Sequence, residues 1–77
     1  MSIQPFVIVG LHIQEKMEMT NPRDKGIAMK FAKLYSPNKI ALIVQEAQSY
    51  TWWRNNPGVA FMKAVGVVNK KEKENAK

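Results

Sequence analysis

The chain lacks cysteine altogether, has a single histidine and carries only six acidic residues among its 77 positions. A small secreted domain usually needs disulfides to support its thin core, so the missing cysteines favour a reducing compartment. The apolar run from Phe6 to Val9 has no basic residue ahead of it, which is unlike a signal peptide. No run approaches the ~20 apolar residues of a transmembrane helix. We therefore expect a cytoplasmic protein that makes no membrane contact.

The residues that metal binding and catalysis require are also scarce. His12 has no cysteine to join it, and the spacing to Glu15 and Glu18 matches no zinc-ligand pattern. No serine or threonine lies in a recognisable nucleophile motif. The four glycines are dispersed and form neither phosphate-binding pattern, GxxxxGK[ST] or GxGxxG. We expect a protein that is not an enzyme and that holds no metal or cofactor.

Positive charge is the feature that the chain has in excess. Twelve Lys and Arg give a net charge of +6, and most of the excess falls within residues 21–39. Such a cluster attracts polyanions or acidic protein surfaces. The cations of this segment for which we expect phosphate contact are Arg23, Lys25, Lys30 and Lys33. The alternative is an ordinary solvated face of an amphipathic helix.

Local patterns predict one helix. Asn21 is a good N-cap and Pro22 suits the first helical position, so a helix is expected from residue 22 to about residue 35. Pro37 ends it, because the residue before a proline disfavours helix. The β-branched runs 6–13 and 39–44 predict two buried strands.

The segment SYTWWRNNPGVAF, residues 49–61, holds most of the aromatic residues. Residues 50–53 are strand formers, and residues 55–58 form a turn signal. For residues 59–68 two interpretations stay open: a helix capped by Asn56, with Pro57 first, or a strand. Valine and glycine are poor helix formers, so the strand is favoured.

Together these elements predict an α+β fold, a small two-layer β-α-β-β domain. One amphipathic helix would cover one face of a three-stranded, mainly antiparallel sheet. Residues 1–69 would form the single domain and residues 70–77 a flexible charged tail. The dipeptide Asn-Pro occurs at 21–22 and again at 56–57, and we interpret this repetition as chance.

A hairpin across the 55–58 turn would create a surface that can bind. Pairing Arg54 with Val59 places aromatic rings and cations on one face, a platform for unpaired bases. That face would hold Tyr50, Trp52, Arg54, Phe61 and Lys63, while Trp53 would face the core. The alternatives are a folded or dimeric core and a protein-binding patch, since aromatic pairs also stabilise sheets without a ligand.

The predicted order is similar to the first half of an RNA recognition motif. Residues 7–11 look like the first-strand motif of that family, and residues 57–62 look like its second. The matching positions of the second motif are Gly58, Ala60 and Phe61. Val59 replaces the stacking aromatic, and too few residues follow for the missing helix and strand. The resemblance implies an open sheet face that holds aromatics and cations.

Two functions follow as hypotheses. The first is a non-enzymatic protein that binds single-stranded nucleic acid with weak sequence preference. The second is a protein-interaction module, such as an inhibitor or adaptor of a larger enzyme, of viral or mobile-element type. A small sheet with an uncovered face also predicts a homodimer.

Overall fold

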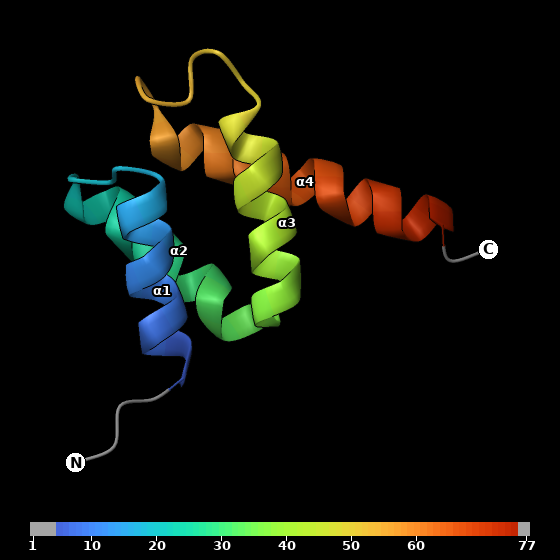
Figure 1. The fold of residues 1–77 in the computed structure, drawn as a ribbon, viewed down its shortest axis with the longest axis horizontal. Helices are drawn as coiled ribbons and strands as arrows, with labels where there is room; N and C mark the ends of the chain where they lie inside the picture. Colours follow the sequence, from blue (N-terminus) through green and yellow to red (C-terminus); the bar gives the residue numbers. More distant parts are fainter. Residues whose placement is uncertain (1–4, 76–77) are drawn as a thin grey trace.

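The structure, a computed structural model, describes residues 5–75 and shows four α-helices with no strand in that range. The helices are α1 (Pro5–Lys16), α2 (Pro22–Leu34), α3 (Pro37–Gln48) and α4 (Pro57–Asn75) (Figure 1). The predicted α+β fold and its three-stranded sheet are therefore wrong. Only the expected helix from residue 22 is confirmed, as α2.

Each helix begins with one of the four prolines of the chain. Proline is favoured at the first helical position because its missing N–H has no partner there. The Asn21 side chain accepts a hydrogen bond from the Arg23 N–H at 2.8 Å, and Ser36 accepts one from the Lys39 N–H at 3.3 Å. At α4 the Asn56 carbonyl accepts from the Ala60 N–H at 2.9 Å. The two Asn-Pro dipeptides, which we interpreted as chance, both start helices.

The two runs predicted as buried strands lie in α1 and α3. In α3 the buried residues are Ile40, Ile43, Val44 and Ala47. This spacing of three and four residues is the apolar stripe of a helix, and it becomes visible only when the run is extended to Ala47. β-branched residues lower helix propensity by a few tenths of a kcal/mol each, and burial of the stripe outweighs that.

The ambiguous segment 59–68 also forms a helix, so the favoured strand and its hairpin are wrong. Ala60, Phe61, Ala64, Val65 and Val68 are buried along one face of α4. The helix continues to Asn75 and thus includes most of the segment expected to be a charged tail. Residues 49–56, which hold the two tryptophans, form the loop between α3 and α4.

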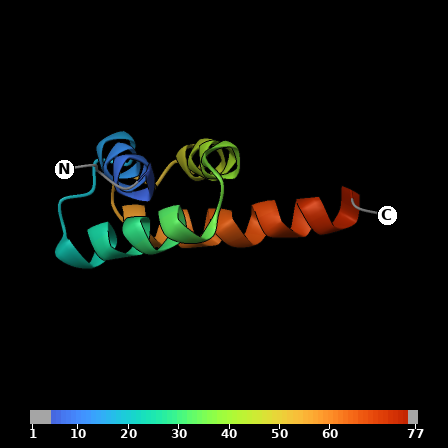
Figure 2. The same cartoon turned by 90° about the horizontal axis from the view of Figure 1, so that it is seen from below.

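The helices form two hairpins, α1–α2 and α3–α4, arranged as two layers. Figure 2 shows α1 and α3 in one layer and α2 and α4 side by side in the other. The largest fully buried side chains come from both hairpins, namely Ile13, Met17, Ile43 and Phe61. Small residues such as Ala28 and Ala32 let α2 approach its neighbours closely. The Phe31 and Phe61 rings, 5.8 Å apart, join α2 to α4.

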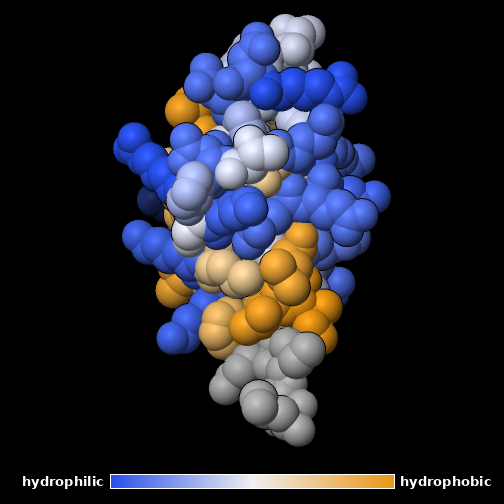
Figure 3. Space-filling model, turned by 90° about the vertical axis from the view of Figure 1, so that its left-hand side faces the viewer, coloured by the Kyte–Doolittle hydropathy of each residue, from blue (hydrophilic) through white to orange (hydrophobic). Residues whose placement is uncertain are grey.

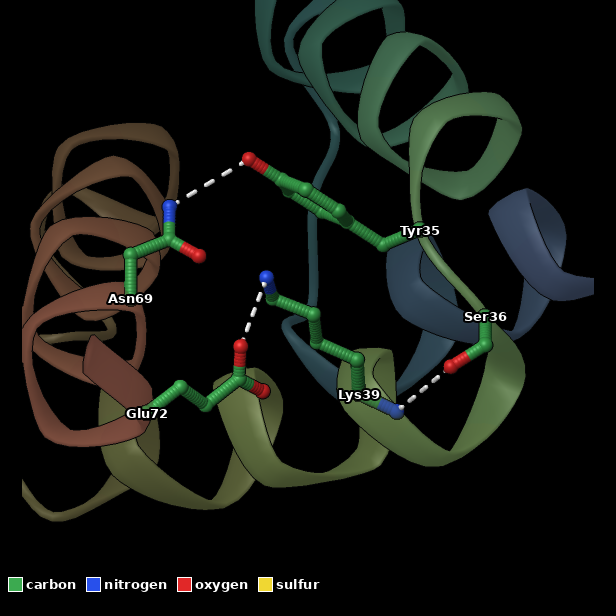
Figure 4. A network of polar contacts seen from close by, with 5 residues as sticks. All are labelled: Tyr35, Ser36, Lys39, Asn69 and Glu72. Carbon is green, nitrogen blue, oxygen red and sulfur yellow. Dashed lines mark hydrogen bonds and ion pairs between the residues drawn. The ribbon is translucent and has the colours of Figure 1, made fainter. Parts of the chain in front are cut away.

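A polar network fastens the α2–α3 corner to α4 (Figure 4). The Asn69 amide donates to the Tyr35 hydroxyl at 3.3 Å. Lys39 pairs with Glu72 at 3.0 Å, and its ammonium lies 4.2 Å from the centre of the Tyr35 ring.

The C-terminal part of α4 projects beyond α3 (Figure 1). No helix within residues 5–75 has both the length and the apolar character needed to cross a membrane.

Candidate nucleic-acid interface

Charge is divided unequally between the two layers of helices. Helices α2 and α4 carry eight Lys and Arg against three Asp and Glu, whereas α1 and α3 carry two against two. One layer thus has a net charge of +5 and the other is neutral. The sequence showed the excess in residues 21–39, but only the fold brings α4 beside α2. The α2/α4 layer is therefore the place where a polyanion would bind.

The same spacing of cations occurs on both helices of this layer. The pattern [KR]-x2-G-x3-K-x2-K occupies residues 23–33 in α2 and residues 63–73 in α4. Steps of three and four residues put these positions on one helical face, opposite the buried side chains. We call the six cations of the two patterns the basic face: Arg23, Lys30 and Lys33 of α2, and Lys63, Lys70 and Lys73 of α4. All six residues are exposed.

Within residues 5–75, none of the six cations of the basic face forms an ion pair with a carboxylate. The ion pairs among residues 5–75 join Lys39 to Glu72, Arg54 to Glu18, and Lys71 to Glu46. Each of these pairs uses a cation outside the basic face. The charges of the basic face are therefore available to a ligand, and they repel one another while it is absent.

Three of the residues predicted for the hairpin platform do come together, although no hairpin exists. The Tyr50 and Trp52 rings stack with centroids 5.5 Å apart and planes 8° from parallel. The Lys63 ammonium lies 5.2 Å from the Tyr50 ring and 5.8 Å from the Trp52 ring. Because Lys63 belongs to the basic face, this aromatic pair lies at the edge of that face.

The other two platform residues are engaged elsewhere. Phe61 is fully buried in the core, so it cannot stack on a base. Arg54 pairs with Glu18 at 3.0 Å, and its guanidinium lies 4.8 Å from the Trp53 ring. Trp53 is buried, whereas Trp52 is half-buried. The predicted single face of five residues is thus reduced to Tyr50, Trp52 and Lys63.

The four cations predicted on α2 are all exposed, but they do not share one face. Arg23, Lys30 and Lys33 belong to the basic face, while Lys25 lies about 160° from Arg23, about 140° from Lys30 and about 80° from Lys33 around the helix. The ammonium groups of Lys30 and Lys33 lie 5.9 Å and 5.6 Å from the Phe31 and Phe6 rings. Lysine stems that cover aromatic rings in this way still keep their charged ends in water.

Tyr50 has an unusual environment beside the basic face. Its hydroxyl oxygen is buried and makes no hydrogen bond of standard geometry to any residue in the described range 5–75. Burial raises the pKa of the Tyr50 phenol, and the Glu46 carboxylate one helical turn earlier adds to the increase. Both effects disfavour the phenolate, so the ring stays neutral at physiological pH.

The surface has two open hollows, and Arg23 of the basic face lines the second of them. One of about 480 Å³ runs between α3 and α4, past Leu42 and Val68. The other, about 440 Å³, lies where the first turns of α2 and α4 meet. There the Asp24 carboxylate packs against Gly58 and uses the space that a side chain would need. Among residues 5–75 no three His, Cys, Asp or Glu side chains gather to hold a metal ion.

Lys70 and Lys73 belong to the basic face, but the prediction did not include them. They were assigned to a flexible tail, whereas the structure describes them as part of α4. The signal that identifies them is the repeated pattern at 23–33 and 63–73, which appears when the spacing of cations is compared rather than their number.

Comparison of the chain with protein-family models, with curated proteins and with solved structures finds no match.

Proposed function

We propose that this protein binds nucleic acid, with the phosphate backbone lying along the basic face of α2 and α4. The observation that carries the proposal is the division of charge, +5 on this layer against zero on the other. Lysine and arginine bind phosphates by charge and release counterions, which makes affinity depend on salt but little on sequence. The missing cysteines favour a site of action inside the cell.

The preferred form is single-stranded. The stacked pair of Tyr50 and Trp52 adjoins Lys63, and Trp52 is half-buried at the edge of the basic face. An unpaired base can stack on an aromatic ring beside a cation, at roughly 1–3 kcal/mol per base, whereas the bases of a duplex are already stacked on one another. The positions of the repeated pattern carry only cations and glycine, which suit contact with phosphate more than reading of base edges.

The test is a titration of a labelled oligo-dT strand at several salt concentrations, followed by fluorescence anisotropy. Six phosphate contacts on a single strand give a slope of log K against log[salt] of about −4. The variant K30Q/K70Q lowers the net charge by two on the basic face. The control K16E lowers it by the same amount on α1, where Lys16 is exposed.

We expect K30Q/K70Q to bind more weakly by tenfold or more at low salt and to show a flatter slope. K16E should bind much as the wild type does. Equal losses in the two variants would mean that only the net charge matters, and would contradict a defined face. Absence of binding at ~20 mM salt, where electrostatic affinity is highest, would reject nucleic acid as the ligand.

A further inference from the structure

The outer face of α1 is apolar and has no partner within the described chain. Residues 5–13 carry no charge, and Ile8 and Leu11 remain 57% and 53% exposed. Figure 3 shows this apolar area in orange at the end of the molecule where α1 begins, within a mostly hydrophilic surface. A helix that is apolar on nearly all sides is normally buried on all sides.

We infer that this face binds a second copy of the same chain through antiparallel packing of the two α1 helices. A two-fold contact uses the same patch on both copies. When Ile8 lies against Leu11 of the second copy, Glu15 falls beside the first turn of the second copy's α1. That turn contains no acidic residue of its own. A carboxylate there is favourable, because the N-terminus of a helix carries partial positive charge.

The charge distribution favours contact through the layer that contains α1. Two copies that met through α2 and α4 would bring layers of +5 together, whereas α1 and α3 are neutral. Contact through α1 leaves both basic faces exposed on the outside of the dimer. The helix has 12 residues and is therefore about 18 Å long. An interface of this size lies at the small end of specific interfaces, so we expect weak, concentration-dependent association.

The experiment is sedimentation equilibrium of the full chain from about 10 to about 500 µM, a range that reports weak dissociation constants. The apparent mass of the wild type should rise from 8.8 kDa toward twice that value. L11K should stay monomeric or associate at least tenfold more weakly. L42K is the matched control, since Leu42 of α3 is 52% exposed outside the α1 face. L42K should associate as the wild type does.

Glu15 gives a second, independent measurement. E15K should weaken association several-fold at low salt, and the difference from the wild type should shrink at high salt. Circular dichroism of each variant checks that the helices are kept, and L11Q replaces L11K where the charge itself unfolds the chain. A wild type that remains at 8.8 kDa throughout, or an L42K variant that dissociates as strongly as L11K, would overturn the inference.

Discussion

Two glycines lie within helices where no tertiary contact requires them. Around Gly26 and Gly66 nothing lies within 4 Å of the position that a Cβ would take. Alanine restricts the unfolded chain and favours the helix, so G26A and G66A should each raise the free energy of unfolding by roughly 0.5–1 kcal/mol. Urea denaturation followed by circular dichroism measures this. G58A is the contrast, because its Cβ would overlap the Asp24 carboxylate and that side chain must then move, so G58A should stabilise the protein less than G26A or G66A.

The buried hydroxyl of Tyr50 predicts a dependence on alkaline pH. Burial, with the Glu46 carboxylate, raises the pKa of Tyr50 above 10.0. The folded state therefore holds the phenolic proton more tightly than the unfolded state, and stability is full below pH 10 and falls as pH rises through the folded-state pKa. Y50F should remove this fall while costing little at pH 7, since the hydroxyl makes no hydrogen bond of standard geometry within residues 5–75.

Absorbance at 295 nm measures the titration of Tyr50 directly. Subtracting the alkaline titration of Y50F from that of the wild type isolates the phenol of Tyr50. The midpoint of the difference should lie above 10.0, the ordinary value. A midpoint at or below that value would contradict the buried, uncharged environment that the structure shows.

The single residues at the helix starts predict the helices more reliably than the composition of the runs that follow them does. All four prolines are first helical residues, and two of them follow a side chain that caps the helix, Asn21 and Ser36. We used this signal for α2 and left it open for α4, where Asn56 and Pro57 support the same interpretation. At α3 the identical signal, Ser36 before Pro37, was taken only as the end of the preceding helix.

At the scale of the element, the errors came from short apolar runs. Runs of valine and isoleucine are consistent with a buried strand and with a buried helix, and length decides between them. The stripe of α3 extends to Ala47 and gives 12 helical residues, too many for a typical strand. The sequence of α1 has no alternation of apolar and polar faces that would predict a helix, because its outer residues Ile8 and Leu11 are apolar as well.

The C-terminal end of α1 is followed by a strained residue, Glu18, whose substitution by glycine should increase stability. Glu18 has φ = 52°, the left-handed conformation in which glycine is preferred. The bonds from the Glu18 N–H to the Glu15 carbonyl, 3.2 Å, and from the Met19 N–H to the Gln14 carbonyl, 2.9 Å, form a Schellman motif around it. A non-glycine residue there costs about 1 kcal/mol or more.

E18G should therefore stabilise the protein by about 0.5–1 kcal/mol, even though it removes the exposed ion pair with Arg54. The gain exceeds the loss because an exposed pair contributes little. E18Q is the control, since it removes the charge but keeps the strained backbone, and it should be neutral or slightly destabilising. Chemical denaturation of both variants measures their free energies of unfolding. A destabilised E18G would mean that the ion pair outweighs the strain.

At the scale of the whole molecule, the positions of the charges could be predicted only in part. The cluster on α2 is contiguous in sequence, so it was found. The contribution of α4 depends on packing between residues 30 positions apart, as the Phe31–Phe61 contact shows, and no local pattern states which helices are neighbours. The prediction of an aromatic cluster was also correct only in part. Tyr50 and Lys63 lie together as expected, although helix α4 and not a hairpin positions Lys63.

The same charge arrangement predicts how salt affects the free protein. The six cations of the basic face have no carboxylate partner among residues 5–75, so their mutual repulsion opposes folding, and salt screens it. Three surface ion pairs act in the opposite sense, but each contributes only about 0–1 kcal/mol. Raising NaCl from about 20 to about 500 mM should therefore raise the melting temperature by about 2–4 °C.

This response has the opposite sign to the effect of salt on nucleic-acid binding, so the two measurements check one charge distribution independently. In K30Q/K70Q the repulsion is smaller, and the increase in melting temperature with NaCl should be smaller too. K16E lowers the net charge equally but lies on the neutral layer, so it should keep most of the wild-type increase. A melting temperature that falls as NaCl is added would show that the ion pairs, and not the basic face, dominate the electrostatics of folding.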